Sequence, residues 1–227
     1  MADNFMSRAE IHDKIAVPHV QKMLKEYGLL GIPYGVEVHD KRLQQALLLL
    51  GRNDDTAMRT RFKPDLYIVS GSDDLLVNPK VRPIMCEVKC ENRGHINFSI
   101  EFDSYCSGKM WDAGKKNVMY VFVRLVGKDP TELKCCWLDE VYVTHVNVPG
   151  RFDFEKNMRE LRDKHPKISF RPSEHKNGAG TPFFIVPGDS KRLRTFESFM
   201  KTTFDFQKLP KEDEPKEDES TPIQLSF

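Results

Sequence analysis

Two carboxylates and an amine lie on two apolar segments of this sequence, and together they could hydrolyse a phosphodiester. Asp65 opens one apolar run, and a later apolar run carries Glu87-Val88-Lys89. Residues two apart in a strand share a face, so Glu87 and Lys89 are expected to point the same way. Carboxylates suit Mg²⁺, which stabilises charge on a phosphoryl group, and a lysine can orient the attacking water. The spacing therefore predicts a metal-dependent phosphodiesterase.

Acid-any-lysine triplets recur in this chain, so context has to choose among them. Only Glu87/Lys89 lies inside an apolar strand with a Pro-Asp pair upstream, whereas Glu132/Lys134 precedes the apolar run 135–138 and is the one serious rival. An ordinary solvated strand face remains the alternative for Glu87 and Lys89. The five triplets are Glu87/Lys89, Glu132/Lys134, Glu174/Lys176, Asp189/Lys191 and Glu214/Lys216.

The pattern Pro64-Asp65 followed by Glu87-Val88-Lys89 resembles the PD-(D/E)xK nuclease superfamily over about residues 7 to 126. The resemblance implies an α/β fold with a mixed central sheet flanked by helices, as in restriction endonucleases. It also implies that Asp65 and Glu87 hold Mg²⁺, for which Mn²⁺ is expected to substitute. Lys89 would orient the attacking water, and cleavage would leave a 5′-phosphate and a 3′-hydroxyl.

Further site residues follow from the same resemblance. Many members of the superfamily add a carboxylate from the first helix to the metal site, and Glu10 matches that position best, with Glu26 and Glu37 behind it. A solvated helix carboxylate is the alternative for each. Branches that act at DNA ends place a Gln-x-x-x-Tyr pair after the lysine, but here Glu101 stands at the first position and Tyr105 at the second. This departure weakens an exonuclease assignment.

Three basic residues, Arg59, Arg61 and Lys63, lie just before Asp65. There they could grip the phosphate backbone of DNA, as arginine and lysine side chains commonly do. Solvated loop charges are the alternative. The body of the chain is mildly basic, because residues 208–227 hold three lysines and six acids while the other residues carry 32 basic and 28 acidic groups.

The periodicity of apolar residues predicts the elements that would position these groups. A helix over 7–27 should end at Gly28, with Pro18 kinking or dividing it, and a second helix should run from Asp40 to Gly51. A polar loop over 52–61 should follow. The later elements are the strands at Asp65 and Glu87 joined by a turn at 71–74, a segment 96–102, a helix near 103–115, a strand over 118–126, one or two strands over 135–148, a helix over 152–164, a strand over 182–186 and a helix over 190–204.

Composition predicts a soluble cytoplasmic protein of a bacterium or a phage-infected cell. No apolar stretch approaches the roughly 20 residues that span a bilayer, and the amino terminus lacks a signal-peptide pattern. Five cysteines at wide spacing fit reduced thiols better than a disulfide framework. We expect one nuclease-like domain over 1–207, with additions to the core over 127–207, and a tail over 208–227.

The tail repeats Pro-Lys-Glu-Asp-Glu, which cannot build a core, and should therefore be disordered. It ends in Gln224-Leu225-Ser226-Phe227, which resembles the peptides that dock into DNA sliding clamps. Gln224, Leu225 and Phe227 would contact the clamp. A meaningless apolar end is the alternative.

Together these features predict a nuclease of replication, recombination or repair. A structure-selective endonuclease that cuts junctions, branches or flaps is favoured, because the tail suggests recruitment to replicating DNA. A sequence-specific restriction endonuclease and an exonuclease remain alternatives, as does a catalytically silent DNA-binding or inhibitor protein with the same fold. DNA is the expected partner, a sliding clamp a second one, and a homodimer is left open.

Overall fold

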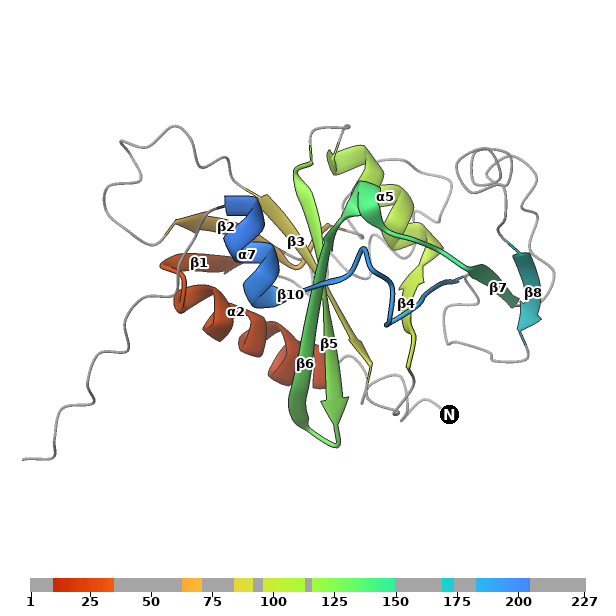
Figure 1. The fold of residues 1–227 in the computed structure, drawn as a ribbon, viewed down its shortest axis with the longest axis horizontal. Helices are drawn as coiled ribbons and strands as arrows, with labels where there is room; N and C mark the ends of the chain where they lie inside the picture. The colour runs from red at the N-terminus through yellow and green to blue at the C-terminus, as the bar shows by residue number, and fades with distance from the viewer. Residues whose placement is uncertain are drawn as a thin grey trace, which may run out of the picture.

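A mixed β-sheet with helices forms the centre of the computed structural model, which describes residues 10–34, 63–70, 84–91, 96–112, 116–149, 169–173 and 183–204 (Figure 1). Among these residues, six strands form the main sheet in the order β1-β2-β3-β5-β6-β10. This arrangement confirms the expected α/β class with a mixed central sheet. The strands are β1 (Leu29–Pro33), β2 (Leu66–Ser70), β3 (Ile84–Glu91), β5 (Val118–Val126), β6 (Asp129–Trp137) and β10 (Arg194–Thr195).

The strands β3 and β5 are the parallel pair of this sheet, and the other neighbours run antiparallel. A parallel pair needs a long crossover connection rather than a tight turn. Here the described part of that crossover contains the strand β4 (Phe98–Glu101) and the helix α5 (Phe102–Asp112). The crossover therefore returns the chain beside the strand that carries Glu87 and Lys89.

One face of the main sheet is covered by helices from both ends of the described chain. The π-helix η1 (His12–Ala16) continues directly into α2 (Val17–Lys25), and α7 (Phe196–Phe204) packs beside them. Val20 and Leu24 of α2 are fully buried in the cluster that also contains Val88 and Phe199. In Figure 1, α2 and α7 lie to the left of the long β5–β6 hairpin.

The opposite face carries a second core, built from α5 and from a second sheet of order β4-β9-β7-β8. The strands added here are β7 (His145–Pro149), β8 (Ser169–Ser173) and β9 (Phe183–Val186), and a short 3₁₀ turn η4 (Leu138–Glu140) follows β6. Tyr105 of α5 and Phe184 of β9 meet edge to face with ring centroids 5.0 Å apart.

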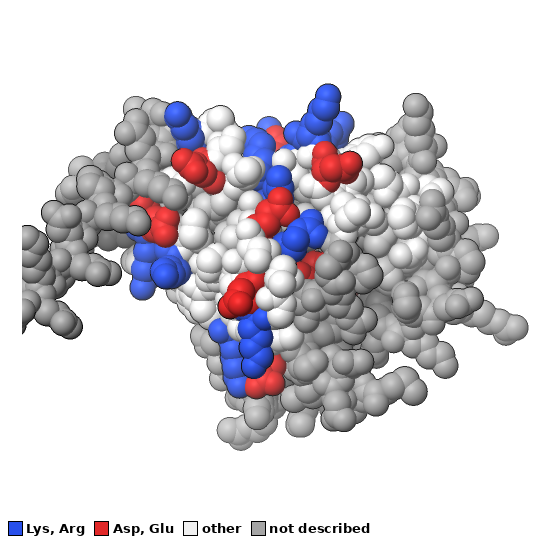
Figure 2. Space-filling model, turned by 60° about the horizontal axis from the view of Figure 1, so that its bottom comes forward, with Lys and Arg blue, Asp and Glu red and all other residues white. Residues whose placement is uncertain are grey.

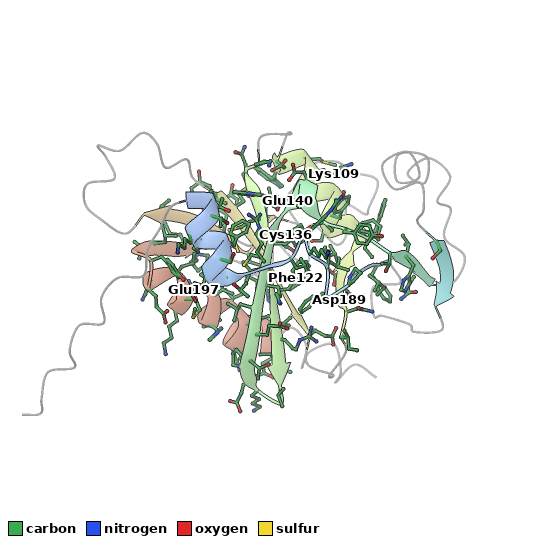
Figure 3. The ribbon with its side chains drawn as sticks, in the orientation of Figure 1. Lys109, Phe122, Cys136, Glu140, Asp189 and Glu197 are labelled. Carbon is green, nitrogen blue, oxygen red and sulfur yellow. The ribbon has the colours of Figure 1, made fainter. Side chains whose placement is uncertain are left out.

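The strand β5 is buried on both faces, which explains its continuous apolar sequence. Val121 and Val123 face the helical core, whereas Tyr120 and Phe122 face the second core. Figure 3 places Phe122 beside Cys136 of β6 near the middle of the molecule. The strand β3, which carries Glu87 and Lys89, therefore pairs with a strand that is buried on both faces.

Several expected elements are confirmed within the described residues. The first helix runs from His12 to Lys25 and changes from π to α between Ala16 and Val17; Pro18 lies in the first turn of α2, where the helical backbone continues, so the helix is not divided at the proline. Gly28 follows with a φ of 70°, which glycine adopts without strain. The predicted strand over 118–126 is β5 itself. None of the helices in the described ranges is long and apolar enough to cross a membrane.

Other expectations need correction. The predicted helix over 190–204 begins only at Phe196, because residues 194–195 pair as β10 with β6, so the Asp189/Lys191 triplet is not a helix start. The strand expected from residue 135 begins at Asp129 and so includes Glu132 and Lys134. The predicted helices over 40–51 and 152–164, the polar loop over 52–61, the turn over 71–74 and the tail over 208–227 lie outside the described residues.

Candidate active site

Asp65 and Glu87 stand opposite each other on adjoining strands. Tyr67 pairs with Met85 and Leu66 with Cys86, so one further step of this antiparallel register brings Asp65 beside Glu87. The backbone N–H of Val88 donates to Asp65 Oδ2 over 2.7 Å. This bond ties the carboxylate to β3 at the point where β2 begins, and thereby fixes its position relative to Glu87.

Glu87 is a buried carboxylate, with 9% of the residue exposed. Its Oε1 atom accepts a hydrogen bond from Ser104 Oγ over 2.8 Å and lies 2.8 Å from Lys89 Nζ. Burial raises the pKa of Glu87 to about 7, opposed by Lys89 and supported by the nearby charge of Asp65. Both polar contacts use the same oxygen, so Oε2 is the atom left to face a cation.

Lys89 points to the same face as Glu87, as the strand period predicts. Its Nζ lies 2.8 Å from Glu87 Oε1 and 2.8 Å from Glu101 Oε2. Burial lowers the pKa of Lys89, but the charges of Glu101, Glu87 and Asp65 outweigh it and hold the pKa well above its ordinary value. The ammonium therefore stays charged near neutral pH and acts as a hydrogen-bond donor.

The first helix contributes a histidine to this site. His12 Nε2 lies 3.1 Å from the carbonyl oxygen of Val88 and 3.5 Å from Asp65 Oδ2, while Nδ1 lies 2.8 Å from Asp13 Oδ1. Both ring nitrogens thus face oxygens that only accept, so both should carry a proton. Burial lowers the pKa of His12, but Asp65 and Asp13 outweigh it and raise the pKa to about 10.

The residue expected from the first helix, Glu10, lies elsewhere. Its side chain is 58% exposed and pairs with Lys14 one turn along the helix. The structure brings His12 to Asp65 and does not bring Glu10 to it, so a metal role for Glu10 stays a prediction. Sequence reasoning missed His12 because it searched the first helix for carboxylates alone.

Two more residues join the site from the crossover between β3 and β5. Glu101 ends β4, and Ser104 lies in the first turn of α5 with its side chain buried. The spacing between Glu101 and Tyr105 drew attention to this segment, but nothing local in the sequence singles out Ser104. Tyr105 itself is buried in the second core against Phe184.

The rival triplet on β6 has a different setting. Lys134 Nζ lies 3.3 Å from Glu132 Oε1, and Arg124 Nε donates to Glu132 Oε2 over 2.8 Å. The guanidinium of Arg124 also donates to the carbonyl of Ile96 over 2.9 Å. These contacts form a partly exposed ion-pair cluster in which Glu132 is the acidic member.

The predicted DNA-binding residues are described only in part. The Nζ atom of Lys63 lies 4.9 Å from the centre of the Tyr34 ring, and the backbone N–H of Tyr34 donates to the carbonyl of Asp65 over 2.8 Å. Lys63 is therefore close to the start of the site strand. The remaining predicted contacts, Arg59 and Arg61 for DNA and Gln224, Leu225 and Phe227 for a clamp, lie outside the described residues.

Charges of both signs are mixed on the surface of the molecule. Figure 2 shows Lys and Arg side chains next to Asp and Glu side chains across the described surface of one face, without a broad field of one sign there. Attraction of a polyanion by a basic face is thus not a feature of the surface described in this view. The local arrangement of the site has to support any functional conclusion.

Asp65 and Glu87 are the residues of this site whose carboxylates could hold a magnesium ion. The contacts of Asp65 engage Oδ2 and those of Glu87 engage Oε1, which leaves one oxygen of each carboxylate for a cation. Within the described ranges, no group of three or more His, Cys, Asp and Glu residues forms a metal site. Mg²⁺ is commonly held by one or two carboxylates with several waters, so two donors suffice.

Comparison with known proteins adds no relative to this picture: the chain matches no protein-family model, no curated protein and no solved structure. The chemistry of the site therefore rests on the residues themselves.

Proposed function

We propose that this chain is a Mg²⁺-dependent DNA nuclease of the PD-(D/E)xK type. The observation that carries the proposal is the placement of three residues together: Asp65 is tied to the backbone of β3 next to Glu87, and Glu87 is paired with Lys89. Among the five acid-any-lysine triplets in the chain, the described residues give this setting to Glu87/Lys89 and not to Glu132/Lys134.

The order of the elements supports the same reading. A helix precedes the antiparallel strands β1, β2 and β3, and a helical crossover then leads to β5, which lies parallel to β3. This order is the one expected of the superfamily core over residues 7–126. Figure 1 shows β2 and β3 side by side, where a substrate would have to meet both carboxylates.

The chemistry follows from the groups present. Asp65 and Glu87 would hold Mg²⁺, which supplies charge stabilisation at the phosphoryl group and lowers the pKa of bound water. The charged Lys89 donates a hydrogen bond that orients the attacking water. The oxygen of that water bonds to phosphorus as the bond to the 3′ oxygen breaks, and a proton passes to that oxygen. The products are a 5′-phosphate and a 3′-hydroxyl.

The favoured substrate is branched DNA such as a junction or a flap, in replication, recombination or repair. An exonuclease is less favoured, because Glu101 replaces the glutamine of the end-cutting branches and pairs with Lys89. A sequence-specific restriction endonuclease is the second reading. We also keep the proposal that the tail binds a sliding clamp, for which deletion of residues 208–227 should abolish co-migration with the clamp and spare cleavage of short oligonucleotides.

A panel of end-labelled DNAs tests the proposal directly. Linear duplex, single strand, flap, splayed arm and four-way junction are incubated with the full chain in Mg²⁺, in Mn²⁺ and in excess EDTA. Discrete metal-dependent cuts at a branch are the expected result, whereas a ladder from one end indicates an exonuclease and cuts at one duplex sequence a restriction enzyme.

Matched variants separate this protein from a contaminating nuclease. Asp65→Ala should remove cleavage while leaving the fold and most DNA affinity, because binding rests on basic groups. Lys134→Ala should cut like the wild type. Cleavage by the Asp65 variant at the wild-type rate would show that this site is not the nuclease.

A further inference from the structure

Lys89 is held by two carboxylates that come from different elements. Glu87 lies two residues before it on β3, whereas Glu101 reaches it from the end of β4, and each oxygen lies 2.8 Å from Nζ. We propose that Glu101 is a positioning residue for the nuclease reaction, which holds the Lys89 ammonium in place while Glu87 faces the metal ion. This inference rests on the proposed function and gives Glu101 a role that the superfamily resemblance did not assign to it.

The hydrogen-bonding capacity of the ammonium supports this role. A lysine ammonium has three N–H donors and no acceptor. Glu87 Oε1 and Glu101 Oε2 take two of them, which leaves one for the attacking water or a phosphate oxygen. Two fixed partners on different elements restrict the long lysine side chain, and so they fix the direction of the third donor.

Glu87 alone is a weak support for Lys89 during catalysis. Its Oε1 is already shared between Ser104 and Lys89. Once the same carboxylate faces a divalent cation, its charge is divided between that cation and the ammonium, and two cations on one carboxylate repel each other. Glu101 supplies a second negative charge 2.8 Å from Nζ, so the lysine keeps a partner when the metal ion is bound.

The backbone around Glu101 is fixed by pairing and packing. Glu101 pairs with Phe183 at the end of the β4–β9 ladder, and its neighbours Ile100 and Phe102 are buried in the second core. Its own side chain is 48% exposed, against 18% for Lys89. The carboxylate thus lies at the rim of the site on a rigid support, where it can pair with Lys89 without being closed off from substrate.

The test compares Glu101→Ala and Glu101→Gln with the matched control Glu132→Gln, which alters a carboxylate beside a lysine away from Asp65. Single-turnover cleavage of the best DNA of the panel is measured over a range of Mg²⁺ concentrations with the full chain. We expect Glu101→Ala to cut about 10- to 100-fold more slowly, the usual loss when a supporting residue next to a metal site is removed. The half-saturating Mg²⁺ concentration and the DNA Kd should stay within about 3-fold of the wild type, well below that range.

The remaining variants separate a positioning role from a structural one. Glu101→Gln keeps an oxygen that accepts from the ammonium and should recover part of the rate, and Glu132→Gln should cut like the wild type. In a Lys89→Ala background, Glu101→Ala should cause little further loss, because the group that it positions is absent. Circular dichroism and thermal melting of each variant show whether the fold is retained.

Several results would overturn the inference. If Glu101→Ala cuts within about 2-fold of the wild-type rate, the inference is wrong, because that loss is far below the effect of a supporting residue. A large rise in the half-saturating Mg²⁺ concentration would make Glu101 a metal ligand instead. A full further loss in the Lys89→Ala background would show that Glu101 acts apart from Lys89. If the wild-type chain cuts none of the DNAs, the proposed function fails too, whereas wild-type cleavage that depends on Lys89 but not on Glu101 refutes the inference alone.

Discussion

Two Glu-x-Lys triplets lie on the same face of one sheet, and they differ in what surrounds them. Lys89 on β3, Phe122 on β5 and Lys134 on β6 are neighbours in one row across the strands. Glu87 is buried and shares an oxygen with Ser104 and Lys89, whereas Glu132 is partly exposed and pairs with Arg124 and Lys134.

The difference lies in what the neighbouring elements supply to each triplet. On β3, the adjoining strand supplies Asp65, the first helix supplies His12, and the crossover supplies Ser104 and Glu101. On β6, the next described strand beyond is the two-residue β10, with Arg194 and Thr195 opposite Cys135 and Lys134. A second carboxylate is therefore delivered to Glu87 and not to Glu132 by the described strands.

The largest difference in cleavage rate between the two triplets should come from replacing their glutamates. Glu87→Gln removes a negative donor of the proposed metal site and should slow cleavage by about 1,000-fold, since a metal ion contributes several kcal/mol and each 1.36 kcal/mol is tenfold in rate. Glu132→Gln should stay within about 2-fold, as expected of a partly exposed ion pair. Initial rates on the same DNA at saturating Mg²⁺ measure both. Equal losses in the two variants would erase the distinction between the triplets.

The lysines should differ by a smaller factor. Lys89→Ala removes the donor that orients water and should cost about 100-fold, the scale of one lost hydrogen-bond donor at a reacting centre. Lys134→Ala breaks a contact of 3.3 Å to Glu132 and should leave the rate unchanged. Single-turnover rates decide the matter, and a Lys134 variant as slow as the Lys89 variant would place the centre on β6.

A third comparison sets His12 against Glu10 within the first helix. His12→Ala removes a positive charge 3.5 Å from Asp65 Oδ2, and the loss of its repulsion should strengthen apparent Mg²⁺ affinity by about 10-fold. Glu10→Ala breaks only an exposed pair with Lys14 and should change nothing measurable. Titration of cleavage with Mg²⁺ gives the two half-saturation values. A larger effect of Glu10→Ala than of His12→Ala would confirm the predicted metal role of Glu10.

The sequence allowed the strand residues of the site to be predicted, and left the others hidden. Asp65, Glu87 and Lys89 were accessible because a strand has a period of two and the two apolar runs follow each other in the chain. His12 and Ser104 reach the site from other elements, through packing that no local pattern records, and the spacing that singled out Glu101 did not predict its contact with Lys89. Their contribution depends on how η1 and α5 lie against β3.

The fold shows the same division between local and distant information. The nearly continuous apolar run over 118–126 made β5 predictable, and the helix over 12–25 was predicted from the spacing of its apolar residues. The second sheet was not predicted, because β4 pairs with β9 and β7 with β8 across long stretches of sequence. The pair formed by Arg194 and Thr195 with β6 displaced the expected start of the last helix for the same reason.

The smallest effect concerns stability and should belong to the rival triplet. Burial raises the pKa of Glu132, but Arg124 and Lys134 outweigh it and hold the pKa below its ordinary value of 4.5. A carboxyl whose pKa is lower in the folded state stabilises the fold above the ordinary pKa, and this contribution is lost as pH falls through the folded-state pKa. Because the Glu132 side chain is 37% exposed, solvent screening limits the stabilisation to about 0.5 kcal/mol.

Glu132→Gln should thus lower the free energy of unfolding by about that amount at pH 7, and the difference from the wild type should shrink toward zero in acid below the folded-state pKa. Urea unfolding of the wild type and the variant, at pH 7 and in acid below the folded-state pKa of Glu132, measures this difference. A loss of several kcal/mol at pH 7 would mean that Glu132 supports the fold as strongly as a buried site residue.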